Sequence, residues 1–208
     1  MFYMVTMPAI IKRFYKDCVW EMDKSEKAIY LTFDDGPCPK VTDFVLNELA
    51  RYNAAATFFC IGENVVKHIG LYKKILGAGH AVGNHTYTHV NGWQVNDKIY
   101  LDEIKKAWEV IDSNLFRPPY GKFKRTQLKK LQQLPLNLVP VMWSVISGDF
   151  DVSISPQQCT NNVINNAGTG AIVVFHDSEK AYKNLKVALP KTLAFFAEKG
   201  YNFAKLVL

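Results

Sequence analysis

The chain has 208 residues, of which 49% are hydrophobic and 21% are charged, and its formal net charge is +6. This composition excludes a disordered chain, and the length predicts one domain with a well-buried core. The positive charge suits an anionic neighbour such as a cell-wall polymer, a lipid headgroup or a nucleic acid. The lysines are spread over many short segments, which indicates solvated faces and argues against a nucleic-acid partner.

Residues 1–24 precede the first predicted strand and are expected to form an extension that packs on a domain spanning 25–208. The apolar stretch at the N-terminus is short, and its charged residues follow it instead of preceding it. We therefore expect neither a secretory signal nor a membrane span. A peripheral membrane contact through Lys12, Arg13 and Lys16 stays open as the alternative to packing. The cysteines form no C-x-x-C pair and favour a reducing compartment. We therefore expect a cytoplasmic protein or one at the inner membrane face.

Strands and helices alternate along the chain. The predicted strands are 28–33, 55–62, 79–85, 114–121, 138–146, 171–177 and 201–208. The predicted helices begin near residue 40, span about 65–75 and 97–112, begin near 125 and 156, and span 184–199. Repeated strand–helix units with apolar strands predict an α/β fold with a parallel sheet covered by helices. About seven such units can close into a (β/α) barrel, with an open doubly wound sheet as the alternative.

Polar side chains stand at the carboxyl ends of the predicted strands. They are Asp34, Asp35, His85, Arg117, Asp149 and His176. In a parallel barrel these ends share one face, which is where catalytic groups collect. The sequence therefore predicts one active-site face assembled from distant segments.

The segment HTYTH (85–89) predicts a metal site on that face. Histidines four residues apart lie on one face of a helical turn and can present two imidazoles to one cation. Two imidazoles and one carboxylate with open positions form a catalytic set for a divalent metal. The cation would also relieve the repulsion between Asp34 and Asp35, because one aspartate binds it and the other stays free beside it.

Five segments carry a specific resemblance. They are TFDDGP (32–37), HTYTH (85–89), RPPYG (117–121), WSVISGDF (143–150) and VFH (174–176). In this order they resemble the motifs of the polysaccharide deacetylase family, also called the NodB-homology or carbohydrate esterase family 4 domain. The resemblance implies a single-domain, distorted (β/α)7–8 barrel. It also implies a metal-dependent hydrolase that removes acetyl groups from N-acetylated sugars in chito-oligosaccharide, peptidoglycan or a lipid-linked sugar.

The same resemblance assigns roles residue by residue. The metal ligands are Asp35, His85 and His89, and the implied cofactor is one divalent ion, zinc or alternatively cobalt or nickel. Asp34 resembles the general base, and Arg117 resembles the residue that orients it.

Other positions carry over in the same way. His176 resembles the general acid with Asp149 as its charge partner, and Tyr120 resembles the oxyanion-hole donor through its backbone N–H. Three residues stand at substrate-binding positions: Pro118, Phe150 and Val174. Structural roles are the alternatives: helix caps for the paired aspartates, an ion pair for Arg117, a turn for Asp149 and core packing for His176.

The chain departs from the family pattern at two positions. Phe150 stands where the family often has tryptophan, so an apolar wall is kept and an indole donor is lost. Ser144 stands where an acidic residue is frequent, which we expect to alter the surroundings of the site. Trp93 and Trp143 either line a sugar site or pack in the core. Two other functions stay open: hydrolysis of another non-peptide amide such as a formamido sugar, and glycan binding without turnover.

Overall fold

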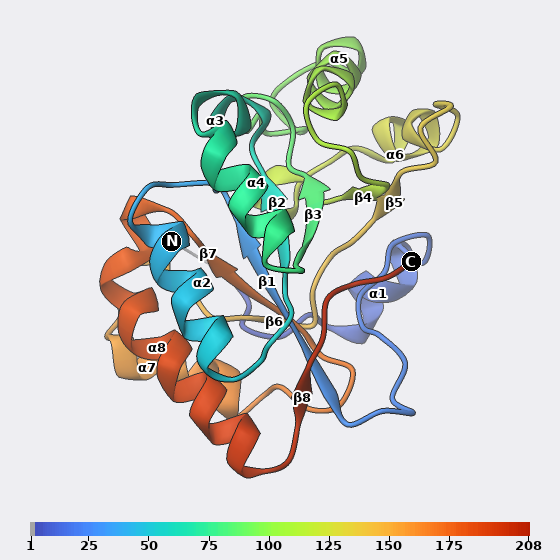
Figure 1. Cartoon of the computed structure of the whole chain (residues 1–208). Coiled ribbons are helices and arrows are strands. Elements are labelled where there is room, and N and C mark those ends of the chain that lie inside the picture. The colour runs from blue at the N-terminus through green and yellow to red at the C-terminus, as the bar shows by residue number, and fades with distance from the viewer. Residues whose placement is uncertain (1–2) are drawn as a thin grey trace.

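A computed structural model describes residues 3–208. Eight strands in that range form one sheet in the order β5-β4-β3-β2-β1-β7-β6, with β8 added beside β1 (Figure 1). Every pair of neighbouring strands is parallel. The sheet curls into a half barrel with helices outside it. The distorted (β/α) barrel expected from the sequence is confirmed, and the open doubly wound sheet is excluded.

Seven of the strands lie inside the predicted strand segments. The strands are β1 (Ala28–Asp34), β2 (Thr57–Cys60), β3 (Ala81–Asn84), β4 (Leu115–Phe116), β5 (Val139–Pro140), β6 (Val145–Ile146), β7 (Ile172–His176) and β8 (Asn202–Phe203). Segment 138–146 is predicted as a single strand, but it forms two strands, β5 and β6. The reason is topological, because β5 pairs with β4 at one edge of the sheet and β6 pairs with β7 at the other.

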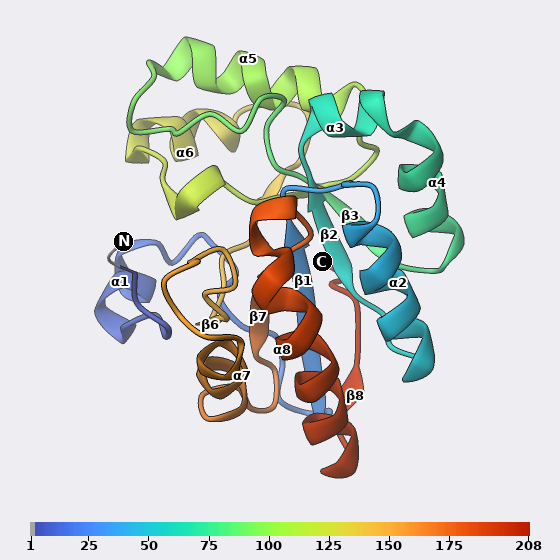
Figure 2. The same ribbon diagram turned by 90° about the vertical axis from the view of Figure 1, so that its left-hand side faces the viewer.

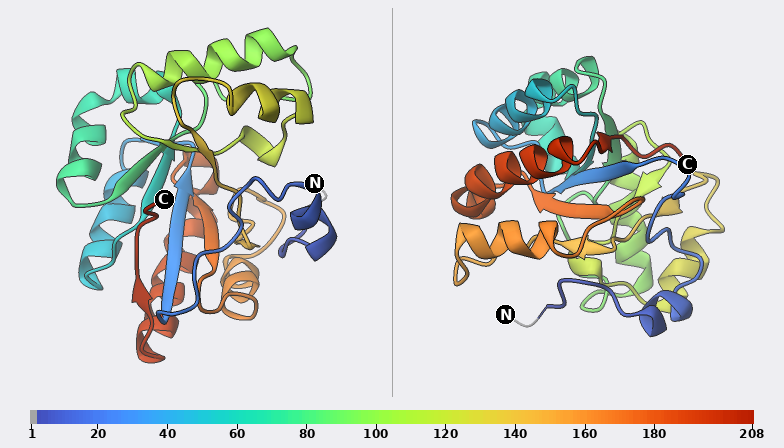
Figure 3. Two further views of the ribbon diagram at one scale, coloured as in Figure 1. Left: turned by 90° about the vertical axis from the view of Figure 1, so that its right-hand side faces the viewer. Right: turned by 90° about the horizontal axis from the view of Figure 1, so that it is seen from below.

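Helices cover the outside of the sheet. They are α1 (Ala9–Phe14), α2 (Val41–Arg51), α3 (Gly62–Lys67), α4 (Ile69–Gly77), α5 (Asp97–Trp108), α6 (Arg125–Leu131), α7 (Pro156–Ile164) and α8 (Glu179–Glu198). Figure 2 shows α2, α7 and α8 alongside the strands, and α5 and α6 beyond their carboxyl ends. Figure 3 shows α1 at the side of the sheet, near the start of α6, where Arg125 Nη2 donates to the Phe14 carbonyl.

Local chemistry decides where several helices begin and end. Asn96 caps α5 by accepting the Ile99 N–H, and Ser155 caps α7 by accepting the Gln158 N–H. The single helix predicted over 65–75 is wrong, because His68 adopts φ −129° and ψ 46° and separates α3 from α4. The last helix begins at Glu179 instead of residue 184.

The core has two parts because side chains alternate across the strands. On the outer face of the sheet, Phe33 stacks on Phe58 and Phe175 with ring centroids 5.0 and 6.1 Å apart, beneath α2 and α8. On the inner, concave face, a second cluster contains Phe59, which follows Phe58, and Val174, which precedes Phe175. Because side chains alternate, Asp34 at the end of β1 and His176 at the end of β7 also face the inside of the half barrel.

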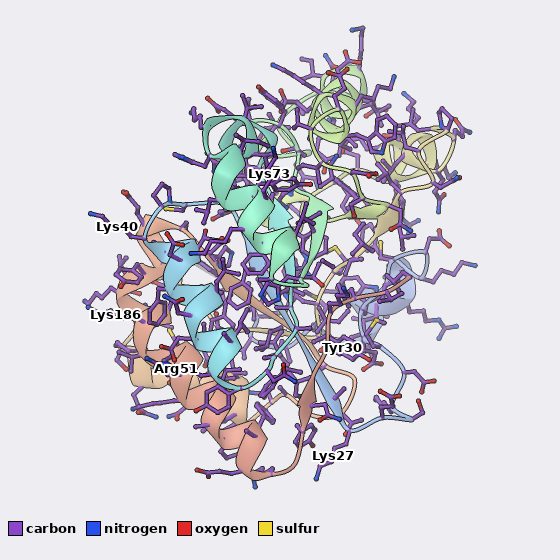
Figure 4. The ribbon with its side chains drawn as sticks, in the orientation of Figure 1. Lys27, Tyr30, Lys40, Arg51, Lys73 and Lys186 are labelled. Carbon is purple, nitrogen blue, oxygen red and sulfur yellow. The ribbon has the colours of Figure 1, made fainter. Side chains whose placement is uncertain are left out.

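Positive side chains lie on several faces of the molecule. Figure 4 labels Lys27, Lys40, Arg51, Lys73 and Lys186, which lie before β1, before α2, and in α2, α4 and α8, and do not form one patch. This spread agrees with solvated faces. Between residues 3 and 208, no helix is both long and apolar enough to cross a membrane.

The N-terminal segment lies between the two open edges of the sheet. Four backbone hydrogen bonds hold it there: Ile146 N–H to Val5 O (2.9 Å), Met7 N–H to Ser144 O (3.4 Å), Val19 N–H to Pro140 O (2.8 Å) and Met142 N–H to Val19 O (2.7 Å). An uncovered edge strand exposes unpaired backbone groups and invites pairing with another chain. We infer that this segment closes the seam between β5 and β6, while its division from the domain at residue 24 stays a prediction.

Deletion of residues 1–16 should destabilise the protein, because it removes the pairing partner of β6. We expect the free energy of unfolding in urea to fall by about 2–4 kcal/mol, from lost backbone hydrogen bonds and buried apolar contacts. Ile10→Ser is the control, since Ile10 is 61% exposed on α1 and its change should cost under about 0.5 kcal/mol. Equal stability of the truncated and full chains would show that the segment does not support the sheet.

Candidate active site

The predicted polar residues meet at the carboxyl ends of β1, β3, β4 and β7. Asp34 ends β1 and is paired in register with His176, the last residue of β7. His85 follows β3 directly, and the Arg117 N–H donates to the Asn84 carbonyl at the end of that strand. The expected convergence of these residues is therefore observed in the geometry.

Three of these side chains form a cluster with the geometry of a metal site. The candidate ligand atoms of Asp35, His85 and His89 all lie within 4.8 Å of one another. The Asp35 Oδ1 atom is 3.2 Å from His89 Nε2 and 3.8 Å from His85 Nε2. It is buried, and it has no hydrogen-bond partner among residues 3–208. This buried carboxylate oxygen faces two imidazole nitrogens and receives no hydrogen bond. A cation bound between these three atoms would satisfy it.

The protonation of His85 fits a ligand role. Its Nδ1 lies 2.7 Å from the Arg117 carbonyl oxygen, which can only accept, so Nδ1 carries the hydrogen. In the neutral ring Nε2 then has a free lone pair directed at the cluster. Burial lowers the pKa of His85 to about 4, although the carboxylate of Asp34 opposes the shift.

The charge of Asp35 is also set by the cluster. Burial alone would raise its pKa, but the neighbouring rings of His89, His176 and His85 lower it well below its usual range. One carboxylate and two imidazoles with space for further ligands form a set that binds zinc and related divalent ions.

The loop that carries the two histidines differs from the expected helical turn. Residues 85–91 are not helical, and both Thr86 (φ 63°) and His89 (φ 61°) have left-handed backbone conformations. The start of α3 holds this loop, because Gly62 N–H and Glu63 N–H donate to the carbonyls of Thr86 and Tyr87. The spacing of the histidines predicted their proximity correctly, but the helical reason for it was wrong.

Asp34 stands beside the cluster and is held by a buried arginine. Its Oδ1 accepts from Arg117 Nη1 at 2.8 Å, and its Oδ2 is 4.0 Å from His85 Nε2. Both residues are buried. The ion pair with Arg117 therefore leaves the second oxygen of Asp34 free and facing the cluster.

Arg117 is fixed by contacts on every side. Its guanidinium donates to Thr32 Oγ1 (2.7 Å), Val141 O (3.2 Å) and Met142 O (2.8 Å) in addition to Asp34. Its Cζ lies 4.0 Å from the centre of the Phe59 ring. Burial lowers the pKa of Arg117, and the charge of Asp34 opposes this.

His176 and Asp149 form a second pair on the far side of the cluster. Asp149 is fully buried and accepts twice from His176, through Oδ2 from the backbone N–H and through Oδ1 from Nδ1, each at 2.8 Å. Burial alone would lower the pKa of His176, but the charges of Asp149, Asp35 and Asp34 outweigh it and raise the pKa to about 9. This shift favours the protonated imidazole at neutral pH.

The remaining predicted residues surround the cluster. Tyr120 sits in a tight turn (Pro119–Gly121) with φ 60°, and its ring centroid is 4.6 Å from that of His89. Pro118 is buried directly before that turn. Val174 faces the inner core of the curl. Phe150 packs edge-on against the His176 ring, with centroids 5.0 Å apart.

Ser144, the second departure from the family pattern, contacts the start of β7. Its hydroxyl donates to the Ile172 carbonyl and accepts the Ile172 N–H, at 3.3 and 3.1 Å. Ile172 begins β7, and His176 ends it, four residues or about 13 Å further on. The effect of Ser144 on the surroundings of the site stays a prediction.

Two residues at the site were not predicted from the sequence. Asp177 is fully buried, and its carboxylate accepts from Gly36 N–H (3.0 Å) and Thr42 Oγ1 (2.6 Å), so it holds the loop that follows Asp35. Tyr3 packs against Phe150 with ring centroids 5.1 Å apart. The sequence did offer a signal for Asp177, because this acidic residue directly follows His176, the candidate general acid. It offered none for Tyr3, whose contact with Phe150 depends on tertiary structure.

The comparisons with known proteins agree with this geometry. The family model described as polysaccharide deacetylase matches residues 21–139. The chain belongs to the polysaccharide deacetylase family. A peptidoglycan-N-acetylglucosamine deacetylase of Bacillus cereus is 36% identical to it over 191 residues, which are 88% of this chain and 68% of that protein. A chitooligosaccharide deacetylase of Azorhizobium caulinodans is 33% identical, over 82% of this chain and 85% of that protein.

A solved polysaccharide deacetylase shares the whole fold. The crystal structure of the Bc1960 peptidoglycan N-acetylglucosamine deacetylase, in complex with 4-naphthalen-1-yl-N-oxidanyl-benzamide, has a TM-score of 0.87 and 32% identity. It covers 96% of this chain, and this chain covers 95% of it. The likeness therefore extends beyond the residues that the family model matches.

The pKa of His176 should depend on Asp149. In Asp149→Asn we expect it to fall from about 9 by about 1–3 pH units, because the neutral amide no longer favours the imidazolium. The measurement is an NMR titration of the His176 ring with a chelator present. Asp151→Asn is the matched control and should leave this pKa nearly unchanged. An unchanged value in Asp149→Asn would show that the pair does not set the charge.

Asp177 should stabilise the loop that follows Asp35 through its acceptor oxygens. Asp177→Ala leaves the Gly36 N–H buried without a partner, so the free energy of unfolding should fall by about 1–3 kcal/mol. Asp177→Asn keeps an acceptor and should cost much less. Urea denaturation measures both. If the two variants lose the same stability, the hydrogen bond to Gly36 is not what matters.

Proposed function

We propose that this protein is a divalent-metal-dependent hydrolase that removes acetyl groups from N-acetylated sugars. The observation that carries the proposal is the cluster of Asp35, His85 and His89, with the free oxygen of Asp34 beside it. Membership of the polysaccharide deacetylase family supports the reaction. The relatives, which are deacetylases of peptidoglycan and of chitooligosaccharide, favour a glycan that contains N-acetylhexosamine.

In this proposal Asp35, His85 and His89 hold one cation, which is zinc or alternatively cobalt or nickel. When bound, it would polarise the amide carbonyl and lower the pKa of a water molecule towards about 7. That shift matters because an ordinary aspartate, with a pKa of about 3.9, is a weak base. Asp34 takes the proton from the attacking water, and Arg117 orients Asp34 through their hydrogen bond.

The other residues act on the developing charge and on the leaving group. The Tyr120 backbone N–H donates to the oxyanion, a contact worth about 3 kcal/mol in related chemistry. His176, held by Asp149, donates a proton to the leaving amine nitrogen. Val174, Pro118 and Phe150 line the acetyl and sugar positions.

The finer assignments are also proposals. The substrate is a glycan or a lipid-linked sugar, with no nucleic acid as partner. The place of action is the cytoplasm or the inner membrane face, where α1 offers Lys12 and Arg13 to headgroups. Two alternatives remain for the reaction: another non-peptide amide, such as a formamido sugar, or glycan binding without turnover.

Replacing each member of the aspartate pair should separate the two roles. Asp34→Asn should abolish acetate release, by about 100-fold or more, while the protein keeps its metal. Asp35→Asn should lose the metal itself. The assay is acetate release from chito-oligosaccharides and peptidoglycan fragments with and without chelator, alongside metal analysis. Asp43→Asn is the control, because Asp43 is a surface aspartate paired with Lys74.

Each contrary result identifies a different error. Loss of metal in Asp34→Asn, with metal kept in Asp35→Asn, means that the roles of the two aspartates are exchanged. Bound metal without acetate release from any sugar supports hydrolysis of another amide. Metal-free protein that binds glycans supports the silent binding module.

A further inference from the structure

The N-terminal segment reaches the candidate active site at Tyr3. Thr6 forms an antiparallel backbone bridge with Val145. In an antiparallel pair, each step back along one strand is a step forward along the other, so this register places Tyr3 beside Gly148. The contact is observed, because a Cβ atom at Gly148 would overlap the Tyr3 hydroxyl. Gly148 has a φ of 78°, which favours glycine, and it leaves the space that the tyrosine occupies.

Three aromatic rings lead from this segment to the proposed general acid. The Tyr3 ring packs edge-on against the Phe150 ring, with centroids 5.1 Å apart and an interplanar angle of 61°. Phe150 packs in the same way against His176, with centroids 5.0 Å apart and an angle of 72°. Edge-to-face pairs of this kind are favourable beyond the area that they bury. Phe150 is the middle ring, so its position depends on Tyr3 as well as on His176.

The backbone that carries Phe150 is held separately from its ring. Asn184 on α8 is buried, and its Nδ2 donates to the carbonyls of Asp149 and Asp151, at 3.2 and 3.0 Å. These bonds fix the residues on both sides of Phe150. Loss of the Tyr3 ring should therefore free the Phe150 side chain without displacing Asp149.

The orientation of His176 depends on two contacts. Its Nδ1 is bonded to Asp149 Oδ1 at 2.8 Å, which fixes one ring nitrogen. A single hydrogen bond leaves the ring able to tilt about it, and the Phe150 ring opposes that tilt. In the proposed reaction the electron pair of the breaking C–N bond goes to the amine nitrogen, which takes the Nε2 proton of His176 as acetate is released. That transfer needs Nε2 within hydrogen-bond reach of the amine nitrogen.

We propose that Tyr3 is a positioning residue that holds Phe150 against His176 and so keeps the His176 ring aligned with the leaving amine nitrogen. This inference rests on the proposed function, which makes His176 the general acid. Phe150 stands where the family often has the larger tryptophan, and Tyr3 adds an aromatic ring from outside that motif. The N-terminal segment is then part of the active site as well as a partner of the sheet.

Removal of the Tyr3 ring should impair proton donation more than the other steps. In the metal-loaded protein, Tyr3→Ala should lower kcat for deacetylation of chitopentaose about 5- to 20-fold, with KM changed less than about twofold. Hydrolysis of 4-nitrophenyl acetate should change less than about twofold, because nitrophenolate leaves without a proton. Tyr3→Phe keeps the ring and should retain both activities.

NMR spectroscopy of the chelator-treated protein gives a measurement that depends on neither metal nor turnover. An aromatic ring packed on an imidazole shifts the His176 ring-proton signals away from those of an exposed histidine. In Tyr3→Ala these signals should move towards the exposed values, whereas Tyr3→Phe should keep them. Spectra are compared well below the His176 pKa of about 9, so that the ring carries the same charge in each variant. A spectrum of His176→Gln assigns the signals.

Met4→Ala is the matched control, since Met4 adjoins Tyr3 and is 38% exposed, and it should change neither measurement. Unchanged His176 signals in Tyr3→Ala would overturn the positioning role. An equal fall in amide and ester hydrolysis would also overturn it, because that indicates a general structural effect. If the parent protein releases no acetate while the His176 signals still move in Tyr3→Ala, the proposed function fails and Tyr3 remains the residue that positions His176.

Discussion

The structure depends above all on one buried guanidinium. Arg117 donates to Asp34 through one edge, to the backbone of residues 141 and 142 through the others, and its carbonyl accepts the Nδ1 hydrogen of His85. A single residue therefore orients both the proposed base and a proposed metal ligand. It also joins β1, β3, β4 and the chain that leaves β5. Because a buried charge is tolerated only when it is fully paired, these contacts are mutually dependent.

The site also shows how two adjacent carboxylates can serve different purposes. Asp34 follows the inner register of β1 and meets Arg117, whereas Asp35, at φ 81°, leaves the strand and turns towards His85 and His89. This change of backbone conformation lets two consecutive aspartates have different partners. Asp177 supports that change by holding Gly36 from below, where there is no room for a Cβ atom.

Much of the fold was accessible from the sequence because long apolar runs such as β1, β2 and β7 allow only buried parallel strands. The split of 138–146 into β5 and β6 was not, since periodicity says nothing about which sheet edge a segment joins. The cluster was predictable because its members stand at strand ends. The conformation of residues 85–91 was not, because it is imposed by contacts with α3. The exposure of Trp93 and burial of Trp143 likewise depend on packing that composition cannot reveal.

The most direct test of the account is X-ray absorption spectroscopy of the zinc-loaded protein at the zinc edge. If Asp35, His85 and His89 hold the ion, its ligands are two imidazole nitrogens and a carboxylate oxygen at about 2.0–2.2 Å, and the imidazole signals are lost or reduced when His85 and His89 are replaced. A spectrum with sulfur ligands at about 2.3 Å, or without imidazole scattering, would contradict it.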